Sequence, residues 1–518
     1  MTAKMRLAAP LKRHGSINNS DQPEGGYSGV RCERFHFLIL KLLACRVNPP
    51  MKATIKCIKS WWFLGAACLL APGCAHYQPK PISAEQNLAR IEGRTLNDPG
   101  VAQYLRECKL ERASESAPWN LEMLTRVAFY YHPDLEAARA KWAVAKAGTV
   151  TAGQRPNPSV TVSPAHNVTT VTPSPWMVAA SLDVPMETAG KRGKRIALAR
   201  QLSEAARLSI AATAWEVRAR LRRALMEMWA AEAQEKLLEQ QLAAQQEVVR
   251  LLEGQLAAGA ITPAEMTRKR ILREQTRLAL VEARNRLTLA RAPLAQALGL
   301  PARALEGATF DFAEFNQTPR EVPTEEARHR ALLSRADVLG GLAEYAASEA
   351  ALRLEIAKQY PDIHLNPGYE FDQGDHKWGV GLGLELPILN QNRGPIAEAK
   401  ARREEAAAKF NGLQARVLGE IENALTAYEA ARRKVSAASP LVEELDRQER
   451  LTERLLEAGE VSRQAVAAAR LEQAAAALAL FDAKVKAQEA AGQLESALQS
   501  PLELPAAWFT QPQNANLK

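Results

Sequence analysis

Cysteine and histidine are scarce in this chain, and their spacing gives no metal site. The 518 residues include six Cys and eight His, and four of the cysteines (32, 45, 57 and 68) precede residue 73. No His-Glu-x-x-His motif, no Cys-x-x-Cys motif and no glycine-rich phosphate loop occurs. Nucleophile motifs are also missing. We therefore expect no metal site, no cofactor and no enzymatic activity, and the His and Cys content indicates no metal pathway.

Acidic residues are sparse only at the N-terminus, where the net charge is concentrated. Residues 1–73 contain eleven Lys/Arg and three Asp/Glu, a net charge of 11 − 3 = +8. The chain as a whole carries +9, so the remainder carries 9 − 8 = +1. The rest of the chain has no basic stripe interleaved with aromatics, which argues against a nucleic-acid partner.

The N-terminal apolar stretch is too short for a spanning helix, which needs about 20 apolar residues. Three lysines within 51–60 precede an apolar stretch at 61–70, followed by Ala71-Pro72-Gly73-Cys74. This order predicts a secretory signal at 51–73, with Met51 as a plausible start and 1–50 as an extended or misassigned leader. The end resembles a bacterial lipobox, whose Cys is lipidated after cleavage, although Ala71 stands where Leu is preferred. Cys74 is the expected lipidation site, and an ordinary signal peptide stays open as the alternative.

The remainder of the chain contains two copies of an internal repeat. Five landmarks recur in the same order, at offsets that drift only from 203 to 200. They are Asp134 and Asp337, Pro158 and Pro361, 182–185 and 384–387, 258–262 and 458–462, and 298–301 and 498–501. Because most landmarks are Pro, Gly or strand residues, a chance alignment of alanine-rich helices does not explain them. Each repeat is expected to contain a helix, two strands, a very long helix, a glycine tip and a returning helix.

The second repeat shows the clearest strands. After a polar turn predicted at 372–377, apolar residues alternate with Gly379, Gly381, Gly383 and Glu385; the apolar ones are Trp378, Val380, Leu382, Leu384 and Leu386. Alternation of this kind gives a strand one apolar face, and about 9–11 residues suffice to cross a bilayer at a tilt. These five residues are therefore predicted to face lipid. A soluble sheet packed on helices stays open as the alternative.

Four strands are too few for a membrane barrel, since the smallest known have eight. Unpaired strand edges in lipid would cost several kcal/mol per backbone group. If the strands span the membrane, the chain must oligomerise, and three copies would supply twelve strands.

The helical runs are too long for a globule. Residues 194–252 and 395–458 each read as one helix, the second with a kink expected at Pro440. Helices in globular proteins average about 11–12 residues, so these must pack side by side as in a coiled coil.

This order of elements resembles the outer membrane factor family, typified by TolC, and the segments 155–158 and 182–193 look most like its CzcC-type heavy-metal efflux branch. The resemblance implies a mainly helical, internally duplicated fold and a trimer with a twelve-stranded barrel in the outer membrane, joined to a helical tunnel through the periplasm. It also implies a periplasmic adaptor and an inner-membrane pump as partners, with this chain as a passive conduit for small solutes, heavy-metal cations among the candidates.

The two glycine tips fall where members of that family meet the adaptor. Their residues are Gly259, Ile261 and Thr262 in the first repeat and Gly459, Val461 and Ser462 in the second. Glycine permits the left-handed turn at a helix end, and Thr262 and Ser462 can cap the next helix. Ala465 and Ala468 stand where some members carry gating carboxylates, so gating is left open, with Glu457 and Glu460 as substitutes.

The resulting division of the mature chain has five parts: an N-terminal periplasmic segment (74–118), repeat 1 (119–300), a linker (301–330), repeat 2 (331–500) and a tail (501–518). A periplasmic adaptor and a structural coiled-coil lipoprotein of the envelope stay open as alternatives to the channel.

Overall fold

The computed structural model describes residues 77–110, 114, 117–168, 174–317 and 325–502. The predicted leader, Cys74 and nearly all of the predicted tail lie outside these residues. The chain divides into a unit of residues 2–88 and a unit made essentially of residues 89–518. In the smaller unit, the described part is an extended segment followed by the start of helix α3 (Ala84–Glu92). The paragraphs below concern the larger unit.

The larger unit repeats one order of elements twice, which confirms the predicted duplication. The first copy comprises α5 (Leu121–Tyr131), α6 (Pro133–Ala152), β1 (Ser159–His166), β2 (Trp176–Met186), α7 (Lys191–Ala257) and α8 (Pro263–Leu298). The second comprises α10 (Glu325–Ser334), α11 (Ala336–Ala357), β3 (Ile363–Asp372), β4 (Asp375–Leu384), α12 (Arg393–Glu457) and α13 (Arg463–Leu498). Helix α4 (Pro99–Glu107) precedes the first copy, and η2 (Ala302–Leu305) and α9 (Ala313–Asn316) lie between the copies. Helix α10, the counterpart of α5, begins within the segment expected to be a linker.

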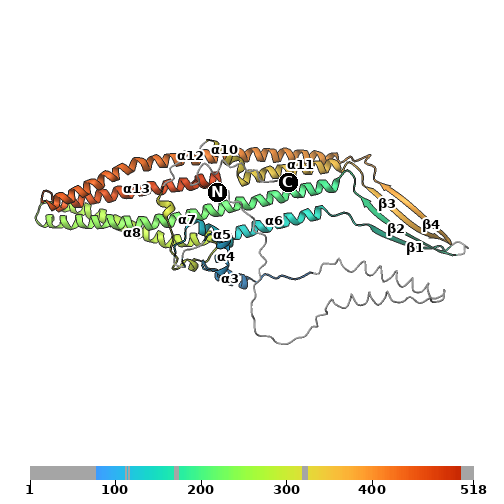
Figure 1. The fold of residues 1–518 in the computed structure, drawn as a ribbon, viewed down its shortest axis with the longest axis horizontal. Coiled ribbons are helices and arrows are strands. Elements are labelled where there is room, and N and C mark those ends of the chain that lie inside the picture. The colour runs from blue at the N-terminus through green and yellow to red at the C-terminus, as the bar shows by residue number, and fades with distance from the viewer. Residues whose placement is uncertain (1–76, 111–113, 115–116, 169–173, 318–324, 503–518) are drawn as a thin grey trace, which may run out of the picture. The chain divides into compact units, whose positions relative to one another are not determined.

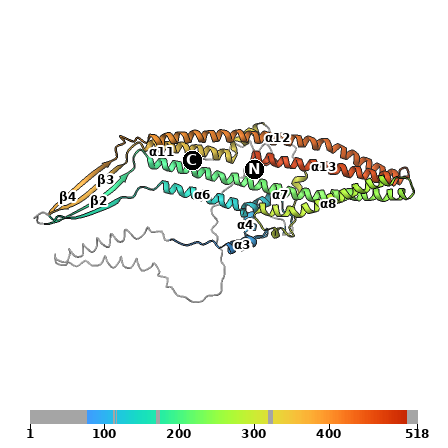
Figure 2. The same ribbon diagram turned by 180° about the vertical axis from the view of Figure 1, so that it is seen from behind.

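The long helices lie side by side in one row rather than in a closed bundle. Toward the helix tips, the order of packed neighbours is α8, α7, α13, α12, and toward the sheet it is α6, α7, α11, α12. Figures 1 and 2 show this row from opposite sides, with the sheet at one end of the helices and the tips at the other. Among the described helices, none is both long enough and apolar enough to span a membrane.

The two longest helices exceed their predicted lengths. Helix α7 has 67 residues and α12 has 65, which corresponds to roughly 100 Å each. Gly193 lies in the first turn of α7 and Gly254 in its last turn, and neither ends the helix, because a single glycine costs a helix only about 1 kcal/mol relative to alanine. Helix α12 continues through Pro440, and the hydroxyl of Ser439 donates to the carbonyl of Val435 just before it.

The four strands form one antiparallel sheet in the order β1-β2-β3-β4, so β2 and β3 join the two repeats. The turn between β3 and β4 consists of Gln373 and Gly374 alone, both with positive φ, as two-residue hairpins require. The prediction of a six-residue turn at 372–377 was therefore wrong. Asp375 to Lys377 are polar although they already belong to β4, and their polarity suggested a loop.

Strand β4 ends at Leu384, so Leu386 lies outside the strand in which it was predicted. Glu385 and Pro387 flank Leu386, and a residue before proline cannot easily continue a regular ladder that needs the next N–H. The amide of Ile388 instead donates to the carbonyl of Leu386 (2.8 Å), which closes a tight turn.

A buried polar network fastens the two repeats together between the sheet and the tips. Arg222 of α7 donates to the backbone carbonyl and the side-chain oxygen of Gln488 in α13 (2.9 Å each). Glu495 of α13 pairs with Arg218 (2.8 Å) and Arg222 (3.4 Å). A Cβ at Gly492 would lie 2.4 Å from Arg222 Nη1, so glycine leaves the space that the guanidinium fills. The Gln488 amide also holds the segment after α9 through the carbonyl of residue 317 (2.7 Å).

Replacing Glu495 with Ala should therefore lower the free energy of unfolding by about 3–5 kcal/mol, because it leaves the buried Arg222 and the half-buried Arg218 without their counter-charge. Glu429→Ala, which removes an exposed partner of Arg433, should change it by less than about 1 kcal/mol. Thermal unfolding followed by circular dichroism compares the two variants, and equal shifts would contradict the role of the network.

Candidate functional site

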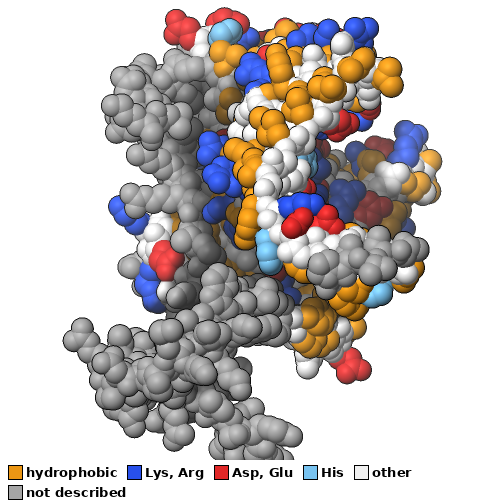
Figure 3. All heavy atoms as spheres, turned by 90° about the vertical axis from the view of Figure 1, so that its right-hand side faces the viewer, with side chains coloured by type: hydrophobic (Ala, Val, Ile, Leu, Met, Phe, Trp, Pro, Cys, Tyr) orange, Lys and Arg blue, Asp and Glu red, His pale blue; other side chains and the backbone are white. Residues whose placement is uncertain are grey.

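One face of the sheet is apolar across all four strands. Side chains on this face meet in pairs across the strands, such as Leu365 with Leu382 and Tyr369 with Trp378. The face comprises Val160, Val162, Pro164, Trp176, Val178, Ala180, Leu182, Val184, Met186, Ile363, Leu365, Pro367, Tyr369, Phe371, Trp378, Val380, Leu382 and Leu384, with His166 and His376 near the hairpin turns. Leu382 is 71% exposed, so no other described segment covers this part of it. Figure 3 looks at the sheet end, where hydrophobic side chains gather in a band.

The opposite face of the sheet is mostly small or polar. Strand β4 contributes Gly379, Gly381 and Gly383, and the other strands contribute mainly Ser, Thr, Asp, His, Asn and Glu. On this face Asp183 of β2 and His364 of β3 form a pair, with Nδ1 3.0 Å from Oδ1. The sheet thus separates an apolar surface from a polar one.

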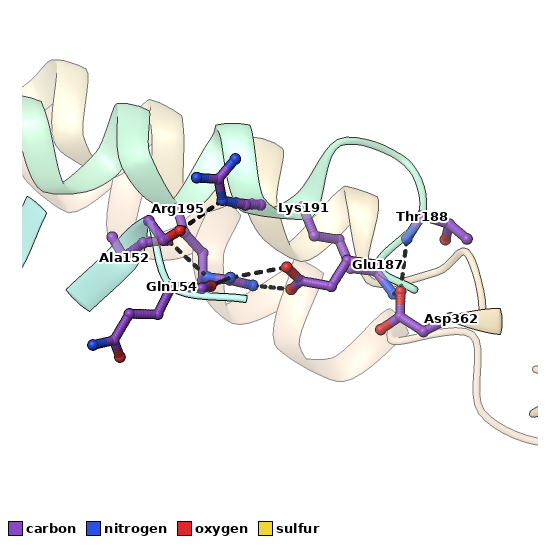
Figure 4. Close-up of polar contacts among 9 residues, drawn as sticks. Ala152, Gln154, Glu187, Thr188, Lys191, Arg195 and Asp362 are labelled. Atoms are coloured by element: carbon purple, nitrogen blue, oxygen red, sulfur yellow. Dashed lines mark hydrogen bonds and ion pairs between the residues drawn. The ribbon is translucent and has the colours of Figure 1, made fainter. Parts of the chain in front are cut away.

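The place where the sheet joins the helices is held by a cluster of charges (Figure 4). Glu187, directly after β2, forms an ion pair with Arg195 of α7. The guanidinium of Arg195 also donates to the carbonyl of Gln154 (3.1 Å), just after α6. The end of α6, the end of β2 and the start of α7 are therefore bound at one point.

A second set of contacts at the same junction reaches β3. Lys191 Nζ lies 2.8 Å from Asp362 Oδ1, and the amide of Thr188 donates to the same oxygen (2.8 Å). Burial opposes ionisation of Asp362, but the hydrogen bonds from Lys191 and Thr188 outweigh it and lower the pKa of the carboxyl. From the sequence alone, segment 182–193 stood out for its family likeness and residues 182–185 as a repeat landmark, but no charged junction was predicted there. The missed signal is the set of acidic and basic residues packed between a strand and a helix.

Both tips have the geometry that their sequence predicted. Gly259 and Gly459 have φ of +71° and +77°, and open space surrounds both. In each tip the residue after the glycine donates its amide to the carbonyl five residues earlier, at 2.8 Å and 2.9 Å. The hydroxyls of Thr262 and Ser462 accept the amide hydrogen bonds that cap α8 and α13. Docking of an adaptor at these residues stays a prediction.

Apolar contacts join the two tips to each other. Val249, Leu252 and Met266 of the first hairpin pack with Ala467 of the second, and Ile261 packs against their edge. Val461 is half-buried, whereas Glu457 and Glu460, the substitutes considered for the gate, are exposed.

Charged contacts, in contrast, stay largely within each hairpin at the tips. Arg470 pairs with Glu453 (2.6 Å) and Glu449 (3.5 Å) in the second hairpin, and Arg270 pairs with Glu253 (2.9 Å) in the first. Burial and the neighbouring Glu453 carboxylate raise the pKa of Glu449.

A family model and a characterised relative both indicate similarity to efflux and resistance proteins. A model of the family described as outer membrane efflux protein matches residues 127–300 and 327–499, about two thirds of the chain. The cobalt-zinc-cadmium resistance protein CzcC of Cupriavidus metallidurans is 25% identical over 300 residues, which cover 57% of this chain and 69% of CzcC.

Solved structures share the fold. A structure of CusC superposes with a TM-score of 0.58 at 20% identity, covering 74% of this chain and 92% of that one. The outer membrane protein VceC of Vibrio cholerae gives a TM-score of 0.58 at 19% identity, covering 74% of this chain and 97% of that one.

If the apolar face meets lipid, a charge there should harm assembly far more than a charge on the polar face. Leu382→Lys should cost about 2–4 kcal/mol near the bilayer midplane. Gly379→Lys, on the opposite face with open space around it, is the matched control. The measurement is the fraction of protein that stays in membranes after urea extraction, and equal losses would contradict this assignment of the two faces.

Two glycines five residues apart should respond to alanine in opposite ways. Gly254→Ala, inside α7, should stabilise the protein by about 0.5–1 kcal/mol, because alanine favours the helix. Gly259→Ala should destabilise it by a comparable or larger amount, because its φ of +71° disfavours a side chain. Midpoints of thermal unfolding test the difference; a stabilised Gly259→Ala protein would show that the tip adopts another turn.

Proposed function

The chain belongs to the outer membrane efflux protein family, and on that premise we propose that three copies form an export channel across the outer membrane and periplasm. The alternatives of a periplasmic adaptor and a purely structural coiled coil are set aside by this membership. The channel is a passive conduit with no catalytic step of its own.

The sheet is the observation that supports the proposal most. Its strands have 8 to 11 residues, close to the length that a tilted strand needs to cross a bilayer. The apolar face suits lipid and the polar face suits an aqueous lumen. Within one chain β1 and β4 are edges, and in lipid their free backbone groups require partners. Pairing β4 of one copy with β1 of the next closes twelve strands from three four-stranded sheets.

The row of helices also has two open edges, and the helix at each edge exposes apolar side chains. Helix α8 lies at one edge and exposes Ile271, Leu278 and Leu289 on a single face. Helix α12 lies at the other edge and exposes Leu418, Leu441 and Leu451. Exposed apolar residues on helices next to an open edge favour burial against another copy. Three such rows then form a tube that continues the barrel.

At the far end of this tube, the six tip residues dock the adaptor that links the channel to an inner-membrane pump. The tips suit this role because they are turns with exposed backbone, held in place by the apolar contacts between the hairpins. The pump supplies the energy. Cys74, if lipidated, adds an anchor in the outer membrane.

The cargo is proposed from the likeness to CzcC, a cobalt-zinc-cadmium resistance protein. We place divalent heavy-metal cations first among the solutes that this channel exports.

Growth of a deletion strain across metal cations, dyes and antibiotics tests the cargo. Sensitivity limited to zinc, cobalt, nickel or cadmium is expected, and the complete chain supplied on a plasmid should reverse it. Sensitivity mainly to dyes and drugs would keep the channel and reject the metal cargo. Recovery of the chain as a monomer after chemical crosslinking in intact cells would reject the channel itself.

A further inference from the structure

The polar face of the sheet contains an imidazole whose orientation is fixed by a carboxylate. His364 of β3 places Nδ1 3.0 Å from Oδ1 and 3.2 Å from Oδ2 of Asp183 in β2. The two residues lie 181 positions apart in the sequence and meet only because β2 and β3 join the repeats. Their side chains are 43% and 38% exposed, so the pair lies open on the sheet surface.

This contact decides which ring nitrogen is available to a ligand. An ionised carboxylate only accepts hydrogen bonds, so Nδ1 must carry the proton that it donates to Asp183. In the neutral ring the lone pair then belongs to Nε2. Protein imidazoles that bind metals commonly have this arrangement, with the second nitrogen donating to a carboxylate that orients the ring.

The neighbouring strand leaves the ring uncovered. Gly383 of β4 pairs with His364, and a Cβ there would lie 3.2 Å from the His364 Cβ. Gly381 pairs with Asn366 in the same way, at 3.3 Å from its Cβ. The two glycines thus leave the β4 side of the imidazole without neighbouring side chains, whereas Pro185 of β2 pairs with His364 on its other side. Asn366 adds a polar group nearby, because its Nδ2 would lie 3.4 Å from a Cβ at Gly383.

We propose that His364, oriented by Asp183, is an inner-sphere ligand for divalent transition-metal cations that pass along the polar face of the sheet. The inference deepens the proposed function, because it rests on that face lining the lumen. Imidazole nitrogen suits zinc, nickel and copper. The proposal departs from the expectation, based on residue spacing in the sequence, that the His and Cys content indicates no metal pathway. Among the described residues, no group of three or more His, Cys, Asp or Glu could hold a metal ion. The ion therefore keeps most of its water, and the site is weak enough to release it, as conduction requires.

The other described histidines have a different setting. His329 is exposed on α10, outside the sheet. His376 and His166 share the apolar face, where His376 contacts the Tyr369 hydroxyl (2.5 Å) and His166 lies against Trp176. His132 is buried and accepts the amide of Asp134 at the start of α6. His376 is therefore a matched control: the same residue type, in the same sheet, on the opposite face.

Equilibrium dialysis of the purified full chain against Zn²⁺, without a polyhistidine tag, tests the proposal. His364→Ala should remove one Zn²⁺ per chain relative to the unaltered protein, whereas His376→Ala should leave the count unchanged. Asp183→Asn should keep the count and weaken the site by about 10–100-fold, as is typical when the partner of a metal-binding imidazole is altered. His364→Gln, whose amide can still donate to Asp183, should behave like His364→Ala, and it replaces that variant if alanine prevents folding.

Unchanged Zn²⁺ binding by both His364 variants, or an equal loss in His376→Ala, would overturn the inference. Because dialysis measures the isolated protein, either result leaves the proposed channel intact. A monomeric chain in crosslinked cells would reject the channel without altering the dialysis. In cells, His364→Ala should lower zinc resistance while the crosslinked trimer persists.

Discussion

The structure depends on one constraint: a strand that crosses lipid must satisfy its backbone hydrogen bonds within protein. A single chain meets this constraint three times, at β1–β2, β2–β3 and β3–β4, and leaves two edges open. Those edges determine the rest of the architecture. The helices joined to the strands, α6, α7, α11 and α12, lie in the same order as β1 to β4, so they form one row with two open sides instead of a bundle with its own interior.

Contacts at the junction between the sheet and the helices fix the position of α7 relative to the strands. Glu187 and Arg195 bind the end of β2 to the start of α7, while Lys191 and Thr188 bind Asp362 ahead of β3. Because the contacts of Lys191 and Thr188 with Asp362 cross between the repeats, the position of the first long helix is tied to strand β3 of the second repeat. Further along, Arg222 and Glu495 repeat this arrangement between α7 and α13.

Much of this fold could be predicted from the sequence because its signals are local and repeated. Alternation identified β4, long stretches without proline identified α7, and glycine followed by a capping hydroxyl identified both tips. The boundaries were less accurate, since polar residues at the rim of a strand, such as Asp375, look like a turn. The membrane lipid anchor at Cys74 and docking at the tips stay predictions.

Contacts between distant positions could not be predicted in this way. Nothing in the sequence near Asp183 indicates His364, because their meeting depends on the β2–β3 register. The same applies to the junction charges, which look like ordinary surface residues until the strand and helix ends meet. Local pattern determines elements, whereas the pairing of repeats determines which side chains share a face.

The open row of helices also has a consequence for inheritance. A chain that folds correctly, but carries a fault at one edge, still offers its intact edge to normal copies. It would enter mixed assemblies and disable them, whereas a chain that fails to fold would simply be absent. Faults at the β1 and β4 edges should therefore behave as dominant alleles, and faults in the buried network as recessive ones.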